Sequence, residues 1–194
     1  MTCCPSSNVM SDKRQTRAAK TRERLLLAGQ QLAADKVLAE LSVDQVVQAA
    51  GVAKGTFYVH FDSRQAYWTA LHADFHQQAA TRVLAARATA VGDEMLAGTW
   101  AYLDFCLEQA ATKALLLEAR ALPEIRQAVQ AQNRRFAELL SPMIQRRGLA
   151  EPGALAQLWV GMVAEVAIAE AQAGAPQPAL RRALQAMLPT APLA

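Results

Sequence analysis

The segment from Leu41 to Arg64, LSVDQVVQAAGVAKGTFYVHFDSR, constrains the fold of this chain more than any other segment. Ser42 is a suitable N-cap, and Gln45 follows three residues later, as in a capping box. Apolar residues then recur at helical spacing, and Gly51 supplies the left-handed residue that ends the helix. A second short helix is expected at about residues 54–60, directly after this tight turn. Two short helices joined in this way form a helix-turn-helix.

The second of these helices has few apolar residues and several that form hydrogen bonds. Phe57 is its buried anchor, whereas Lys54, Thr56, Tyr58 and His60 are left pointing away from the small core. In a helix-turn-helix, the second helix enters the major groove of duplex DNA.

The distribution of charge favours the same interpretation. The net charge is only +3, but residues 1–64 hold nine Lys and Arg against six Asp and Glu, and the remaining residues hold eleven of each. A run of charge is usually a solvated face. Directly before a helix-turn-helix, a basic run more often approaches phosphates.

The run AGVAKGTFYVHFDSR, residues 50–64, closely resembles the recognition segment of the TetR (tetracycline-repressor-like) family of bacterial transcriptional regulators. The family pattern is an alanine-glycine-hydrophobic turn, a small residue, Lys-Gly-Thr, an aromatic pair, His-Phe and a nearby Lys or Arg. Two residues depart from it. Ala53 stands where a Ser or Thr often contacts a phosphate, and Val59 replaces the second aromatic residue.

The resemblance implies how this unit reads DNA. Thr56, with the close approach that Gly55 permits, is expected to contact base edges, and the neighbouring polar residues are expected to hold phosphates. For Tyr58 and His60 the alternative is packing against the next helix. The whole predicted DNA-contacting set is Arg14, Arg17, Lys20, Ser42, Val43, Lys54, Gly55, Thr56, Tyr58, His60 and Arg64.

We predict an all-α chain in three parts: a disordered leader at residues 1–12, a helix-turn-helix DNA-binding domain at 13–62, and a helical effector-binding and dimerisation domain at 63–190. The first domain starts with a helix at about 16–34. Asp62 is the expected N-cap of a long helix from Ser63 to about Thr89, which joins the domains without a linker. Further helices are expected at about 93–111, 112–119, 123–147, 154–173 and 178–188.

The predicted helix at 154–173 is apolar around nearly its whole circumference, so it is expected to be buried on more than one side. A domain of this size hardly provides such a large core, and the better explanation is a partner subunit. The family resemblance likewise implies a homodimer built on the last two helices. The predicted interface residues are Leu158, Gly161, Glu165, Ile168, Leu180, Leu184 and Met187.

Several large apolar residues of the second domain are most simply core residues. In a regulator of this architecture, some of them would also line an apolar cavity for a small effector. The predicted lining is Phe75, Trp100, Leu103, Cys106, Trp159 and Met162.

Other classes of protein find little support. No run of apolar residues is long enough for a transmembrane span, and no secretory signal is apparent. The odd number of cysteines favours a reducing cytoplasm. His72 and His76 have the spacing of two metal ligands, but two structural histidines are the simpler interpretation. We therefore expect no metal, no cofactor and no enzymatic activity.

The sequence predicts a cytoplasmic, sequence-specific transcriptional regulator, usually a repressor in this family, that binds a palindromic operator in double-stranded DNA. A small hydrophobic or aromatic effector is expected to release it. The alternative is a DNA-binding module that responds to protein partners and not to a ligand.

Overall fold

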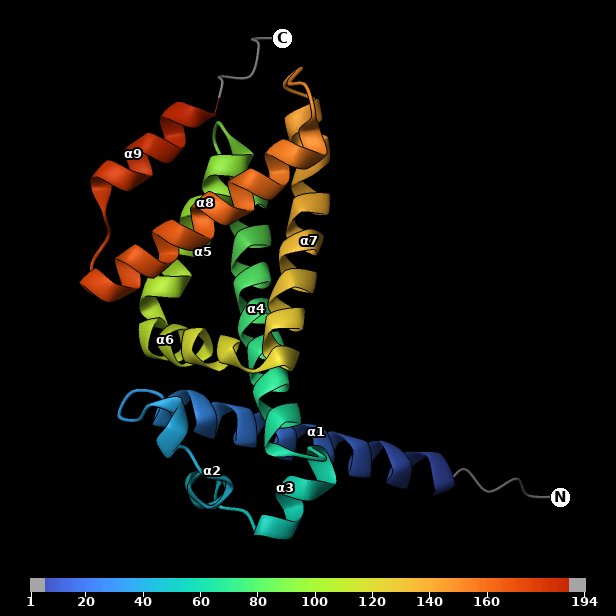
Figure 1. Cartoon of the computed structure of the whole chain (residues 1–194). Helices are drawn as coiled ribbons and strands as arrows, with labels where there is room; N and C mark the ends of the chain where they lie inside the picture. Colours follow the sequence, from blue (N-terminus) through green and yellow to red (C-terminus); the bar gives the residue numbers. More distant parts are fainter. Residues whose placement is uncertain (1–5, 189–194) are drawn as a thin grey trace, which may run out of the picture. The chain divides into compact units, whose positions relative to one another are not determined.

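The computed structural model describes the backbone of residues 6–188 and the side chains of residues 15–188. Every regular element in this range is helical, so the predicted all-α fold is confirmed (Figure 1). The chain divides into two compact units, residues 1–71 and 72–194. The elements are α1 (Ser6–Leu32), η1 (Leu38–Glu40), α2 (Val43–Ala50), α3 (Lys54–His60), α4 (Arg64–Ala88), α5 (Glu94–Glu108), α6 (Ala110–Glu118), η2 (Ala119–Ala121), α7 (Pro123–Gln145), α8 (Pro152–Ala173) and α9 (Pro178–Met187).

The first helix begins earlier than the sequence predicted. We expected a start near Thr16, but α1 starts at Ser6 and includes residues 6–12, which we had assigned to the leader. Between Ser6 and Leu32 the sequence has no proline, and Gly29 is its only glycine. No residue therefore interrupts the helix once it has nucleated.

The core of the first unit is an aromatic cluster from α3, the following loop and α4. The rings of Phe57, Phe61 and Tyr67 lie with centroids 5.1–5.4 Å apart, and all three side chains are buried. The Tyr67 hydroxyl donates a hydrogen bond of 2.9 Å to the carbonyl of Leu25 in α1. This bond and the buried rings fix α1, α3 and the start of α4 in one packing arrangement.

The start of α4 differs in detail from the prediction. Ser63, and not Asp62, caps the helix, because the Ser63 hydroxyl accepts a 3.0 Å hydrogen bond from the N–H of Ala66. The side chains of Trp68 and Leu71 are also buried. The first compact unit therefore extends to residue 71, beyond the predicted boundary at residue 62, and α4 continues from it into the second unit as one helix.

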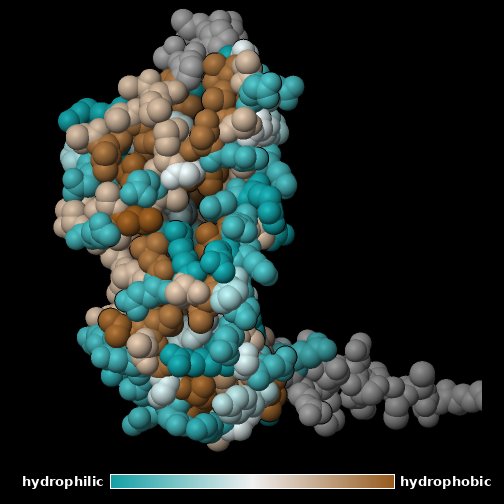
Figure 2. Space-filling view, in the orientation of Figure 1, coloured by the Kyte–Doolittle hydropathy of each residue, from teal (hydrophilic) through white to brown (hydrophobic). Residues whose placement is uncertain are grey.

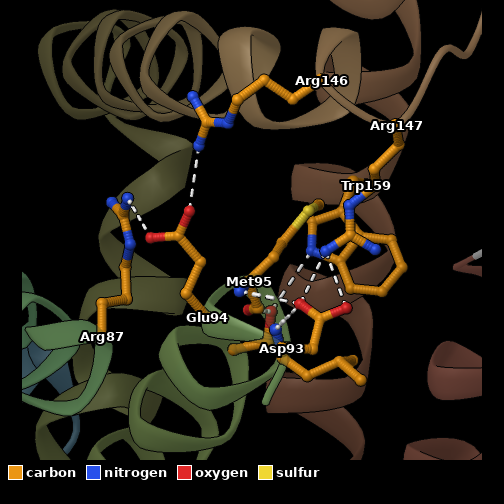
Figure 3. Close-up of polar contacts among 9 residues, drawn as sticks. Arg87, Asp93, Glu94, Met95, Arg146, Arg147 and Trp159 are labelled. Atoms are coloured by element: carbon orange, nitrogen blue, oxygen red, sulfur yellow. Dashed lines mark hydrogen bonds and ion pairs between the residues drawn. The ribbon is translucent and has the colours of Figure 1, made fainter. Parts of the chain in front are cut away.

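In the second unit, the start of α5 is tied to the ends of α4 and α7 by charged side chains (Figure 3). Asp93 caps α5 by accepting hydrogen bonds from Met95 N–H at 2.9 Å and Leu96 N–H at 3.2 Å. The same carboxylate contacts the guanidinium of Arg147 at 2.6 and 2.7 Å. Glu94 bridges Arg87 of α4 at 3.1 Å and Arg146 at 2.9 Å.

Candidate nucleic-acid interface and ligand cavity

The helix α2 has the start and stop signals that the sequence predicted. The N–H of Gln45 donates to the Ser42 hydroxyl at 3.3 Å, and the N–H of Ser42 donates to the Gln45 side chain at 2.9 Å. Both halves of the capping box are therefore present. Gly51 has φ 62° and ψ 42°, the left-handed conformation that turns the chain toward α3.

The helix α3 is held from beneath by one buried residue and exposes most of the others. Phe57 is fully buried, while Lys54, Gly55 and Tyr58 are exposed. Thr56 is half-buried. A Cβ atom added at Gly55 would meet no atom within 4 Å, so the chain's own packing does not require this glycine. Open space at Gly55 is consistent with a backbone that another molecule approaches closely.

Lys54 forms an ion pair with Asp44 of α2, with 2.8 Å between Nζ and Oδ1. The hydrogen bond to Asp44 and its charge raise the pKa of Lys54. Both side chains are exposed, and exposed ion pairs contribute little to stability. Lys54 can therefore exchange Asp44 for a phosphate at small cost.

Val59 was not among the predicted contacts, yet it is the most exposed large apolar side chain of α3, at 80%. An apolar side chain on a recognition helix can contact the methyl group of thymine. The available sequence signal for this contact was the position of Val59, which directly follows Tyr58 and replaces the second aromatic residue of the family pattern.

Five of the remaining predicted DNA contacts fall into two groups. Arg17, Lys20 and Ser42 are exposed, and Val43 and His60 are half-buried. The Arg14 side chain lies outside the described residues.

Arg64 has partners inside its own chain. Its guanidinium donates a 2.7 Å hydrogen bond to the carbonyl of Leu38 and lies 5.7 Å from the ring of Trp68. Arg64 is therefore anchored at the start of α4, and its predicted phosphate contact remains a prediction.

Arg24 has a structural role that the sequence analysis missed. Its guanidinium donates hydrogen bonds to the carbonyls of Ala50 and Gly51, at the carboxyl end of α2. A cation at this end of a helix satisfies unpaired carbonyl groups and complements the helix dipole. The distance in sequence between Arg24 and Gly51 left no local pattern to reveal the contact.

The second unit contains a cavity of about 140 Å³ between α4, α5, α7 and α8. Its polar lining residues are Arg87, Thr99, Tyr102 and Asn133, and every other lining residue is apolar. The apolar lining consists of Ala80, Val83, Leu84, Met95, Gly98, Phe136, Leu139, Leu140, Trp159, Val160, Val163 and Ala164.

Among the six residues predicted to line a ligand site, Trp159 lines this cavity. Phe75, Leu103 and Cys106 are buried in the core instead. The ring of Trp100 lies 5.8 Å from the Arg181 guanidinium, and Met162 is half-buried outside the lining. The cavity uses other faces of the expected helices and a wall from α7, from which no residue was predicted.

The helix α8 keeps an exposed apolar face although its other side is buried. Leu158, at 64%, and Gly161 are exposed with Glu165, and Ile168 is half-buried. Figure 2 shows hydrophobic surface gathered over the region of α8 and α9, whereas the surface along α7 is largely hydrophilic. By length and composition alone, α8 could cross a membrane, a test that core helices of soluble proteins also pass. Its packing against α5 and α7 favours the second explanation.

The predicted interface residues of α9 differ in how exposed they are. Met187 is 60% exposed and Leu180 is 39% exposed, but Leu184 is only 3% exposed. The placement of Leu184 at the surface between subunits is therefore corrected, because its own chain buries this side chain. One face of an amphipathic helix, made of residues three or four positions apart, packs on the core, and Leu184 lies on this inner face of α9.

Residues 25–66, from α1 to the start of α4, match the family model described as "Bacterial regulatory proteins, tetR family". This segment is therefore the DNA-binding domain of the TetR family. The matched segment contains the capping box, the left-handed Gly51 and the exposed α3, which are the features of the DNA-binding unit.

Solved structures of similar fold extend this comparison over most of the chain. A transcriptional regulator from Rhodococcus sp. Rha1 is 20% identical with a TM-score of 0.70, covering 85% of this chain and 92% of that one. A TetR-family regulator from Pectobacterium atrosepticum is 24% identical, with a TM-score of 0.68 and coverages of 89% and 92%. A regulator from Aquifex aeolicus VF5 is 18% identical, with a TM-score of 0.64 and coverages of 86% and 96%. The helical second unit thus has the fold of TetR-like regulators, and the chain is a DNA-binding transcriptional regulator.

Proposed function

We propose that this TetR-family protein is a cytoplasmic repressor that binds a palindromic operator as a homodimer and leaves it when a small hydrophobic or aromatic effector binds. The cavity in the second unit carries the effector part of this proposal. Its volume of about 140 Å³ is close to that of engineered apolar cavities that take up benzene. An aromatic ring or a short apolar chain would fit it.

The operator part of the proposal rests on α3. Thr56, Gly55 and Val59 present a small, largely exposed surface for base edges, and Lys54 and Arg17 supply exposed cations for phosphates. In a two-fold dimer, the two recognition helices would read half-sites about 34–36 Å apart, or a multiple of that spacing.

The dimer part rests on the exposed apolar face of α8 and on α9. Leu158, Gly161, Ile168, Leu180 and Met187 would meet their symmetry mates in the partner subunit. Burying Leu158 and Met187, which are 64% and 60% exposed, would stabilise the dimer through the hydrophobic effect.

The switch would act through α4. This helix begins at Arg64 beside the recognition unit and contributes Ala80, Val83, Leu84 and Arg87 to the cavity. A ligand that favours the released geometry would shift the helix, whereas equal affinity for both states would shift nothing. A coupling of about 1–3 kcal/mol, or roughly 5–150-fold in DNA affinity, is typical of allosteric proteins.

The proposal is tested in two steps. Selection of bound fragments from a random DNA library should return a palindromic motif. Titration of that operator should then show weaker binding in the presence of small aromatic compounds that bind the protein. Filling the cavity with Ala164→Trp should remove this response and keep operator binding, whereas Ala131→Trp at an exposed position of α7 should keep both.

Two results would contradict parts of the proposal. Ligands that bind the cavity yet never change operator affinity would remove the switch and leave the DNA-binding role intact. A selected motif without two-fold symmetry would contradict the palindromic dimer.

A further inference from the structure

A second, much smaller space lies between α4, α6 and η2 in the second unit. It has a volume of about 10 Å³ and is lined by four basic side chains: His72, His76, Lys113 and Arg120. Phe75, Leu116 and Leu117 complete its walls. A volume of this size is about that of one water molecule or one oxygen atom of a larger group.

Two ring nitrogens of the histidines that line this space have no hydrogen-bond partner. They are Nε2 of His72 and Nδ1 of His76, and the two side chains are only 4% and 9% exposed. The imidazole rings lie 4.5 Å apart between centroids. A buried polar atom without a partner is destabilising, and such atoms are rare in native proteins. The pair is therefore best explained by a polar group that occupies the space.

The charges around the space identify the sign of that group. Lys113 is 4% exposed, and its ammonium donates a 3.3 Å hydrogen bond to the neutral hydroxyl of Tyr102. No Asp or Glu lines the space. Burial, with a smaller contribution from Arg120, lowers the pKa of Lys113, because a buried ammonium without a carboxylate is costly; an anion here would stabilise the charged form of Lys113. A metal cation would be repelled by Lys113 and Arg120, although the histidine spacing alone would allow one.

The protonation states agree with this field. Burial, Lys113 and Arg120 lower the pKa of His72 to about 4. Burial, the neighbouring His72 and the same two cations lower the pKa of His76 to about 3. Both imidazoles are therefore neutral at pH 7, and each can donate one N–H.

The small space adjoins the apolar cavity through two aromatic rings. Tyr102 lines the cavity and accepts the hydrogen bond from Lys113. Phe136 also lines the cavity, and its ring contacts His76 edge to face at 5.9 Å. An apolar ligand in the cavity would thus have basic groups behind one wall.

We propose that the space between α4, α6 and η2 is an anion subsite, in which Lys113 and the two histidines bind one oxygen of a carboxylate. The carboxylate comes either from the effector whose apolar body fills the cavity or from a small free carboxylate. The first source rests on the proposed effector function, and the second does not.

Benzoate and benzamide are matched probes, because they share a ring and differ in charge. We expect calorimetry on the full-length protein to show that benzoate binds about tenfold or more tightly than benzamide. A difference of this size is typical of one charge-assisted hydrogen bond. Lys113→Met should abolish the preference. Arg135→Met, which removes an exposed charge from α7, should keep it.

Two further measurements keep the test decisive. Arg120→Gln changes a half-buried side chain, so it should leave the fold intact and reduce the preference for benzoate. Acetate as a competitor separates the two sources. If acetate displaces benzoate, the subsite takes free carboxylates; if acetate has no effect, the subsite takes the head group of a larger ligand.

Three results would overturn the proposal. Benzoate and benzamide bind equally, neither benzoate nor acetate binds, or the preference for benzoate persists in both Lys113→Met and Arg120→Gln. Operator titration is independent of these results. Benzoate that binds through Lys113 but leaves DNA affinity unchanged would keep the anion subsite and contradict only the effector switch.

Discussion

Glu170 of α8 and Arg181 of α9 form a two-bonded ion pair, with Nε to Oε1 and a terminal nitrogen to Oε2 both at 2.7 Å. Glu170 is 0% exposed, and its Oε1 also accepts the N–H of Gln177 at 2.9 Å. Burial alone would raise the pKa of Glu170, but the Arg181 hydrogen bonds outweigh it and hold the pKa below its ordinary value. Arg181 reaches Asp104 of α5 as well, at 2.7 Å, so one guanidinium joins three helices.

Removing one partner of this pair should be more damaging than removing both. Arg181→Leu leaves a buried, unpaired carboxylate, and we expect a loss of about 3–5 kcal/mol in the free energy of unfolding. The double variant Glu170→Leu/Arg181→Leu should lose less, because no charge remains buried. Urea unfolding of the two variants measures the difference. Equal losses would show that packing, and not the unpaired charge, dominates.

Charged substitutions on α8 and α9 should separate dimerisation from folding. Leu158→Glu and Met187→Glu change exposed side chains and should give folded monomers with weak operator binding. Leu184→Glu changes a buried side chain and should destabilise the chain itself. Light scattering and urea unfolding on the same samples distinguish these outcomes. A wild-type monomer at micromolar concentration would contradict the interface.

Substitutions in α3 should alter which DNA sequences are bound. Thr56→Ala should change discrimination at one operator position by about 1–3 kcal/mol, because a side chain that reads a base edge is lost. Arg17→Gln is the matched comparison and should weaken binding about equally for all sequences. Binding to a panel of operator variants tests both. Unchanged specificity of Thr56→Ala would refute its role in base reading.

Arg64 tests a predicted phosphate contact against a structural one. Arg64→Met should lose the hydrogen bond to the Leu38 carbonyl and lower the free energy of unfolding by about 1–3 kcal/mol. If Arg64 also contacts a phosphate, the slope of log affinity against log salt should become flatter by about one. A loss of stability with an unchanged salt slope would leave Arg64 only its structural role.

The two buried histidines should make the protein less stable in mild acid. Their folded-state pKa values, about 4 for His72 and about 3 for His76, lie below the unfolded value of 6.5. The unfolded chain therefore binds more protons, and stability should fall as the pH drops below about 6.5, by up to about 1.4 kcal/mol per pH unit for each histidine. Urea unfolding between pH 7 and pH 5 measures this slope.

His76→Phe removes one of these two proton-binding side chains, so the stability of this variant should depend less steeply on pH. The window above pH 5 also limits the contribution of Asp93, Glu94 and Glu170, whose pKa values are lowered and which lose their stabilising charge at still lower pH.

The parts of the molecule that the sequence predicted well are those set by neighbours in the chain. The capping box of Ser42 and Gln45, the turn at Gly51 and the buried Phe57 all depend on residues a few positions apart. The bounds of α4 and α8 followed in the same way from helical periodicity and chain breaks.

The remaining features depend on contacts between distant segments. Arg24 meets the end of α2, and Leu184 turns to its own core, because of tertiary packing that no local pattern records. The cavity faces were missed for a related reason. An apolar residue such as Leu103 has the same sequence signature whether it fills a core or lines a space, and only the packing of four helices decides between them.

The hydrogen bond from Tyr67 to Leu25 limits which substitutions this chain can accept in evolution. A Cβ atom at Gly29 would collide with the Tyr67 hydroxyl, so any larger residue at position 29 displaces that ring. As long as the Tyr67 hydroxyl stays in place, only glycine fits at position 29. Positions 29 and 67 are therefore expected to vary together among homologues, with a larger residue at 29 only where position 67 has lost the phenol.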